Sequence, residues 1–168
     1  MTSVSSLKRH DPIPDGGMLI RWVPWSKLEK AQDDPERVVG VMGSAFQLRE
    51  KDGVKEPYLS ANWSGHFGGD HHEGVTSAIL QFENCSIQVK KKSVFAVGRV
   101  EHIKSELLSK GKKIRVYYAP MPDSSCPDEP HNPCHVAVSQ IDIGDELLEA
   151  LSRGAWKYYV PATDYFNF

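Results

Sequence analysis

The sequence predicts a single α+β domain, built on a mixed or antiparallel sheet of about five to six strands with two or three short helices. Short apolar runs of strand character outnumber helical patterns, and stretches rich in proline and glycine separate them. The length of 168 residues is that of one ordinary domain. We therefore expect residues 18–168 to form one globular domain with an aromatic C-terminal tail, after a flexible N-terminal segment at residues 1–17.

Strands are expected where β-branched, aromatic and other apolar residues gather in short runs bounded by turn residues. The first such run follows the proline- and glycine-rich residues 12–17 and ends at Pro24. The most continuous run is that at residues 94–100. The expected strands are 18–23, 45–49, 57–63, 94–100, 112–119 and 135–141.

Helices are expected where apolar residues recur at helical spacing between capping residues. The best example has acidic residues in its first turn and Gly154 as its stop. The helix before Gly111 joins two expected strands, and this crossover would be right-handed if those strands were parallel neighbours. The expected helices are 25–31, 100–107 and 145–153. Residues 75–82 also have helical spacing, and a helix is favoured there over the alternative of a strand, which a segment this short could also form.

The composition limits the partners and the compartment of the protein. The formal net charge is -2 and the pI is near 6.4, whereas a phosphate-binding domain is typically strongly basic. No apolar run approaches the ~20 residues that cross a bilayer, and residues 1–11 lack the apolar core of a secretory signal. Three cysteines are too few for a disulfide framework, although Cys126 and Cys134 could pair if their loop curled back. We therefore expect a cytoplasmic protein with no membrane partner.

The densest chemistry lies in the proline-rich loop at residues 126–135, and a second polar loop at 64–74 is rich in glycine and histidine. Zinc prefers thiolate and imidazole ligands, and two such loops meeting at one end of the sheet would leave the open position of a catalytic zinc. Neither loop has a paired-cysteine knuckle or a two-histidine helix motif, so we expect no cofactor and keep zinc as the alternative. The candidate zinc ligands are Cys126, His131, Cys134, His135, His66, His71 and His72.

The same loop offers a catalytic site without metal. Cys134 or Ser60 would be the nucleophile, and His135 or His131 the base that activates it. His135 is the strongest candidate, because Pro133 and the strand that follows hold its backbone rigidly. A buried structural role for the same histidine is the alternative. The chain has no nucleophile elbow, phosphate loop or dinucleotide motif that would support an enzyme.

Asn132 and Arg99 are candidate binding residues. An amide such as Asn132, or Asn62, can orient an imidazole ring, and a guanidinium such as Arg99 can hold an anion. Both residue types are also common at turns and on surfaces, so a purely structural role is the alternative for each.

Two short motifs, LSxxW at residues 59–63 and NPxHV at residues 132–136, are separated by most of the central part of the chain. Together they resemble a pattern found in small uncharacterised bacterial proteins. The resemblance implies that Trp63, a candidate binding residue, and His135 belong to one local arrangement. It favours a bacterial accessory protein and carries no activity.

Our favoured function from the sequence is a non-enzymatic binding or accessory protein that docks to a protein partner or self-associates. The docking surface would be the aromatic tail or an exposed sheet edge. In the alternative, the aromatic rings of the tail close the core. The candidate contact residues of the tail are Tyr165, Phe166 and Phe168.

Two other function classes remain. One is a hydrolase or nuclease built on the His/Cys loops, with or without zinc. The other is a module that binds single-stranded nucleic acid through the lysines around Lys90 and Lys112, with Tyr117 and Tyr118 as stacking platforms. The net charge of -2 makes this last class the least favoured.

Overall fold

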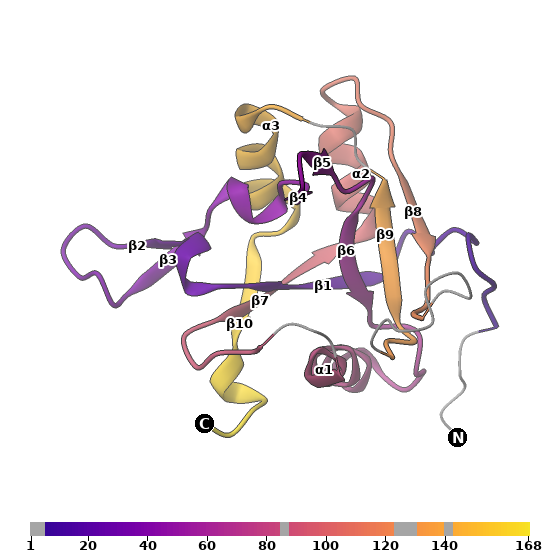
Figure 1. Cartoon of the computed structure of the whole chain (residues 1–168), viewed down its shortest axis with the longest axis horizontal. Coiled ribbons are helices and arrows are strands. Elements are labelled where there is room, and N and C mark those ends of the chain that lie inside the picture. Colours follow the sequence, from indigo (N-terminus) through magenta and orange to yellow (C-terminus); the bar gives the residue numbers. More distant parts are fainter. Residues whose placement is uncertain (1–5, 85–87, 123–130, 140–142) are drawn as a thin grey trace.

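The computed structural model describes residues 6–84, 88–122, 131–139 and 143–168 (Figure 1). Its central element is an antiparallel sheet whose six strands are β1 (Met18–Val23), β6 (Leu59–Trp63), β7 (Val94–Arg99), β8 (Arg115–Tyr118), β9 (His135–Ser139) and β10 (Tyr158–Pro161). The strands are hydrogen-bonded in the order β10-β7-β1-β6-β9-β8, and every neighbouring pair is antiparallel. The predicted α+β domain is confirmed.

Short helices and two small ribbons surround this sheet. The helices are α1 (His71–Leu80), α2 (Val100–Leu108) and α3 (Asp145–Ala150), which continues as the π-helical turn η4 (Leu151–Ala155). The ribbons pair β2 (Leu28–Lys30) with β3 (Val38–Val41), and β4 (Glu50–Lys51) with β5 (Val54–Lys55). The 3-10 turns are η1 (Trp25–Lys27), η2 (Gly43–Phe46), η3 (Gln81–Asn84) and η5 (Ala162–Asp164). None of the described helices has the length and apolar character needed to span a membrane.

Both faces of the sheet are covered, so the protein has two hydrophobic cores. In β1, Leu19 and Val23 belong to one core and Ile20 to the other, as the alternation of a strand requires. Helices α2 and α3 lie on one side of the sheet and α1 on the opposite side (Figure 1). On the α2 and α3 side, the rings of Phe46 and Trp156 stack with their centroids 5.1 Å apart. The sheet is therefore the middle layer of the domain.

The helix expected at residues 25–31 is wrong. Only the single turn η1 forms there, and the chain then continues as β2, which pairs with β3. Leu28 is completely buried opposite Val41 in this ribbon. The tertiary burial of Leu28 thus outweighs the local helical preference of the segment.

The strand expected at residues 45–49 is also wrong. The turn η2 occupies the start of this segment and buries Ala45 and Phe46. Gly43 explains why the turn can pack so closely, because a Cβ atom at this position would lie 2.7 Å from the backbone nitrogen of Glu149. The close contact between η2 and α3 therefore determines the local structure.

Helix α1 begins earlier than expected, inside the loop rich in glycine and histidine. Asp70 and Glu73 form a capping box: the Asp70 carboxylate accepts from the backbone N–H of Glu73 at 2.9 Å, and the Glu73 carboxylate accepts from the backbone N–H of Asp70 at 3.2 Å. His71 and His72 are therefore exposed residues of the first helical turn rather than parts of a loop.

The strand–helix–strand unit expected around α2 is present, but its two strands are not neighbours. Strands β1, β6 and β9 lie between β7 and β8 in the sheet. The connection through α2 therefore carries the chain from one side of the sheet to the opposite edge. The successive antiparallel pairings make β7 and β8 parallel, but they are not the parallel neighbours on which the expected right-handed crossover was conditional.

The two ends of the described chain reinforce opposite edges of the sheet. At one edge β10 pairs with β7, and the rings of Tyr165 and Phe166 pack against Phe95 with centroids 6.4 and 6.0 Å apart. This part of the tail helps to close the core, whereas Phe168 is exposed. At the other edge, residues 10–13 of the N-terminal segment hydrogen-bond to β8.

Candidate functional site

Several residues singled out by the sequence lie in a buried polar cluster between β6, β9 and α1. Asn62 is paired with His135 across β6 and β9. Nδ2 of Asn132 donates to Oδ1 of Asn62 at 2.9 Å, and Nδ2 of Asn62 donates to the carbonyl oxygen of Ala78 in α1, also at 2.9 Å. The three polar side chains are between 1% and 4% exposed. The cluster therefore joins two strands, a loop and a helix inside the protein.

The catalytic candidates Cys134 and His135 are part of this interior. Cys134 is 0% exposed, and its Sγ donates to Oδ1 of Asn132 at 3.4 Å. Nδ1 of His135 lies 2.7 Å from the carbonyl oxygen of Ala119, and because a carbonyl only accepts, this nitrogen carries a proton. Both groups are thus buried, whereas the candidate base His131 is exposed and the candidate nucleophile Ser60 is half-buried.

A second buried contact connects the two loops that the sequence singled out. The hydroxyl of Tyr118 donates to the carbonyl oxygen of Pro133 at 2.6 Å and lies 3.3 Å from Nδ1 of His66. Burial lowers the pKa of His66 below its usual range and raises the pKa of Tyr118. Both side chains are therefore held in their uncharged forms at neutral pH, as suits an interior hydrogen bond.

The candidate zinc ligands do not converge in the described part of the chain. His66 and His135 are buried, whereas His71 and His72 are exposed on α1. Cys126 lies outside the described residues. Among residues 6–84, 88–122, 131–139 and 143–168, no group of three histidine, cysteine, aspartate or glutamate side chains is close enough to hold a metal ion.

Trp63 lies beside the polar cluster and next to a cavity that is lined largely by glycines. Its backbone N–H donates to the carbonyl oxygen of Cys134 at 2.9 Å, which ties the end of β6 to the start of β9. Its indole Nε1 is buried and has no hydrogen-bond partner among the described residues. The cavity next to the ring has a volume of about 280 Å³ and its lining includes Gly16, Gly17, Gly65, Gly68, Gly69 and Gly74.

Arg99 is the last residue of β7 and is paired with Met18 of β1. It is exposed and its Nη1 lies 3.1 Å from a carboxylate oxygen of Glu101. The candidate anion-holding residue is thus partly neutralised by a neighbouring acid on α2.

A surface that combines aromatic and basic residues lies at the other end of β7, and we call it the Trp–Lys surface. Nζ of Lys30 lies 4.4 Å, and Nζ of Lys92 4.9 Å, from the ring centroid of Trp25. Beside Trp25 is a mainly apolar pocket of about 380 Å³ that is also lined by Trp22. The Trp–Lys surface consists of Trp22, Trp25, Lys30, Lys90, Lys91 and Lys92.

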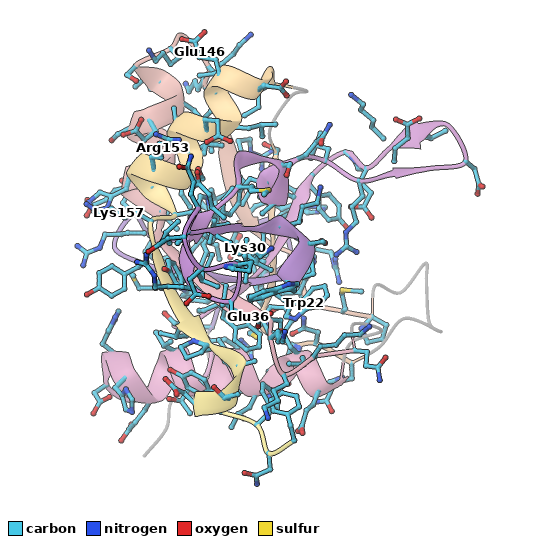
Figure 2. The ribbon with its side chains drawn as sticks, turned by 90° about the vertical axis from the view of Figure 1, so that its left-hand side faces the viewer. Trp22, Lys30, Glu36, Glu146, Arg153 and Lys157 are labelled. Carbon is cyan, nitrogen blue, oxygen red and sulfur yellow. The ribbon has the colours of Figure 1, made fainter. Side chains whose placement is uncertain are left out.

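The pairing of β1 with β7 explains why these distant residues meet. Val23 is paired with Val94, so the residues that follow β1 lie beside the lysines that precede β7. Figure 2 faces this surface, with Trp22, Lys30 and Glu36 in the middle of the view. A carboxylate oxygen of Glu36 lies 2.8 Å from Nζ of Lys92, so an acidic group contacts the edge of this surface.

A smaller pocket of about 210 Å³ adjoins the Trp–Lys surface, and we call it the Arg21 pocket. It forms where β1 separates from β6, since these strands pair only at Leu19 and Ile20. Arg21 fills this separation: its Nε donates to the carbonyl oxygen of Ala45 and its Nη1 to that of Ser60, each at 2.8 Å. The pocket is lined by Arg21, Trp22, Pro24, Lys27, Ser44, Ala45, Gln47, Leu48 and Arg49.

Burial and charge both act on Arg21. Arg21 is 9% exposed. Burial and, to a smaller extent, repulsion from Arg49 lower its pKa to about 10, whereas attraction to Glu56 raises it. The guanidinium remains charged at neutral pH. A cation is thus held at the base of the pocket.

Sequence reasoning missed both the Trp–Lys surface and the Arg21 pocket. It placed the lysines of a nucleic-acid site beside Tyr117 and Tyr118, but Tyr118 is 6% exposed and both tyrosines lie on β8 at the opposite edge of the sheet from β10. The useful signal was the alternation of cations and tryptophans from Arg21 to Lys27, followed by three lysines immediately before a strand. These two stretches of sequence indicate one surface only when the pairing of β1 with β7 is known, because that pairing brings them together.

No protein-family model, curated protein or solved structure matches this chain. The function is therefore argued from the chemistry of the sites.

Proposed function

We propose that this protein is a non-enzymatic binding protein that holds single-stranded nucleic acid on the Trp–Lys surface. The observation that carries the proposal is the placement of two ammonium groups over the ring of Trp25, next to an apolar pocket walled by Trp22. A single strand presents phosphates and flat bases together. Cations beside aromatic rings are the side chains that bind this combination.

The local charge supports an anionic partner despite the net charge of -2. Lys90 and Lys91 are exposed and form no ion pair with the described part of the chain, whereas Lys92 contacts Glu36. Salt largely screens the interaction between exposed charges that are more than a Debye length of about 8–10 Å apart, so a partner at this surface responds mainly to the nearby lysines. Acidic residues far from this surface, such as Glu146 on α3, therefore have little effect on the binding of an anion there (Figure 2).

The burial of the catalytic candidates supports binding rather than catalysis. The thiol of Cys134 and the ring of His135 are enclosed by the sheet and α1, and both have hydrogen-bond partners there. Such groups stabilise the interior without needing a substrate.

A protein partner, favoured from the sequence, has less support. Tyr165 and Phe166 pack against the core rather than presenting their rings to a partner. The outer edge of β10 is open among the described residues, but this strand is four residues long and ends in Pro161, which lacks an N–H group. Docking to an acidic protein segment is therefore an outcome of the test rather than the proposal.

The test is a fluorescence-anisotropy titration of a labelled oligothymidine with the parent protein and two matched variants. The double change Lys90→Gln and Lys91→Gln removes two charges from the Trp–Lys surface. The control, Arg153→Gln and Lys157→Gln, removes two exposed charges at positions that Figure 2 shows away from the centre of this face. We expect the first variant to bind several-fold more weakly than the parent and the control to bind like the parent.

Two results would overturn the proposal. One is an absence of oligonucleotide binding by the parent protein at low salt. The other is tighter binding of labelled polyglutamate than of the oligonucleotide, which would favour an acidic protein partner.

A further inference from the structure

The Arg21 pocket and the Trp–Lys surface share Trp22 and Pro24, so a ligand on the surface reaches the pocket directly. We infer that the Arg21 pocket binds a terminal phosphate group, a phosphomonoester carried by the end of a nucleic-acid strand or by a free nucleotide. The strand as the source of this phosphate rests on the proposed function, whereas the recognition of the phosphate itself does not.

Arg21 is a buried cation with free donors. Its two hydrogen bonds go to the neutral carbonyl oxygens of Ala45 and Ser60, and it forms no ion pair with any described aspartate or glutamate. A guanidinium has five N–H groups, so three remain for a ligand. A buried cation without a bound counter-ion is costly, and an anion in the pocket would offset that cost.

The rest of the lining adds further donors. Lys27 and Arg49 add two cations, and Ser44 adds a hydroxyl. Trp22 also borders the pocket, while its side chain packs against the core that contains Ile20. The lining contains no aspartate or glutamate, and Glu56, which raises the pKa of Arg21, lies outside it. The pocket therefore presents donors and positive charge.

The charge of the pocket favours a terminal phosphate over an internal one. A phosphomonoester carries about 1.5 to 2 negative charges at neutral pH, whereas an internal diester carries one. Three cationic side chains line this pocket of about 210 Å³. They should bind the phosphomonoester more tightly than the diester, because hydrogen bonds between charged partners such as guanidinium and phosphate are the stronger ones. A group of this size also leaves the rest of the strand outside the pocket, on the Trp–Lys surface.

Arg49→Gln and Lys27→Gln are the variants that test this inference. The side chain of Arg49 is exposed and forms no hydrogen bond or ion pair with the described residues, so we expect its replacement to keep the fold. Arg21→Gln is avoided, because it would leave the buried carbonyl oxygens of Ala45 and Ser60 without donors. Arg153→Gln is the matched arginine control on η4.

The experiment compares oligothymidines that differ only in a hydroxyl or a phosphate at the 5′ end or at the 3′ end. We expect the parent protein and Arg153→Gln to bind one phosphorylated form about tenfold more tightly than the hydroxyl form, equivalent to about 1.4 kcal/mol. In Arg49→Gln and Lys27→Gln this ratio should fall toward one. Far-ultraviolet circular dichroism checks that each variant is folded.

The outcomes separate the inference from the proposed function. Binding of the hydroxyl oligonucleotide without any preference for a phosphorylated end overturns the inference and leaves the proposed function standing. Binding of a nucleoside monophosphate or inorganic phosphate, measured by calorimetry and weakened by Arg49→Gln, supports the inference even if no oligonucleotide binds. Binding of none of these ligands overturns both.

Discussion

Asn62 and Asn132 hydrogen-bond to each other inside the protein, with 2.9 Å between Oδ1 of Asn62 and Nδ2 of Asn132. Asn62 also donates to the carbonyl oxygen of Ala78. The pair thus ties β6 to the loop before β9 and to α1. Since both amides are buried, removal of one leaves polar groups of the other elements without partners.

We therefore expect Asn62→Ala to lower the free energy of unfolding by about 1–3 kcal/mol. Urea denaturation followed by circular dichroism measures this change. Asn167→Ala, at an exposed position of the tail, is the control and should unfold like the parent. An Asn62→Ala protein with the unfolding midpoint of the parent would show that the buried amide pair does not stabilise the fold.

The contact of Gly65 with Trp63 gives a second prediction. A Cβ atom at residue 65 would lie 2.6 Å from two carbon atoms of the Trp63 ring. Gly65→Ala must displace the indole or the backbone, and we expect it to lower the free energy of unfolding by about 1–3 kcal/mol. Gly16→Ala is the control, because a Cβ there meets nothing within 4 Å. Equal thermal stability of the two variants would contradict the packing described for Trp63.

The C-terminal tail gives a third prediction. Removal of residues 164–168 deletes the rings of Tyr165 and Phe166 that pack against Phe95. We expect a loss of about 2 kcal/mol in the free energy of unfolding, since both rings are only partly buried. Removal of residues 167–168 alone should have little effect, because Phe168 is 57% exposed. Melting curves test the difference, and an unchanged melting temperature in the longer truncation would contradict the closing role of the tail.

The pKa of His66 gives a fourth prediction. Burial lowers this pKa in the folded protein, so the unfolded chain, with a value of about 6.5, takes up the proton first as the pH falls. The contribution of the uncharged ring to stability is therefore complete above about pH 6.5 and is lost as the pH falls from there through the folded value.

Urea denaturation at about pH 7.5 and about pH 5.5 measures this dependence. His66→Gln should reduce the difference in stability between the two conditions. His72→Gln, at an exposed position of α1, should retain the difference found in the parent. If both variants retain it, the acid sensitivity of the protein has a source other than His66.

Local patterns were sufficient to predict the strands that are buried in the sheet. The start and end of β1 follow from the run 18–23 and Pro24, and β7 follows from the apolar run before Arg99. Helix α3 was likewise signalled by its acidic first turn, although the chain beyond Ala150 continues as a π-helical turn. In these elements, local preference and tertiary burial agree.

The remaining elements depend on contacts that the sequence does not display. Leu28 lies in a strand because it pairs with Val41. The chain forms a turn at Gly43 because α3 packs closely against it. The same limit applies to the sites. The proximity of Trp63 and Cys134 is consistent with the two short motifs, but the Trp–Lys surface depends on the register that pairs Val23 with Val94.

The most direct test of the central claim is the salt dependence of oligothymidine binding. For single strands, the logarithm of the binding constant falls with the logarithm of salt concentration by about 0.7 for each phosphate neutralised. Lys90→Gln with Lys91→Gln should therefore make this slope shallower by about 1.4, because two ion pairs with phosphates are lost. Arg153→Gln with Lys157→Gln should keep the slope of the parent. Equal slopes in all three proteins would contradict the Trp–Lys surface as the nucleic-acid-binding site.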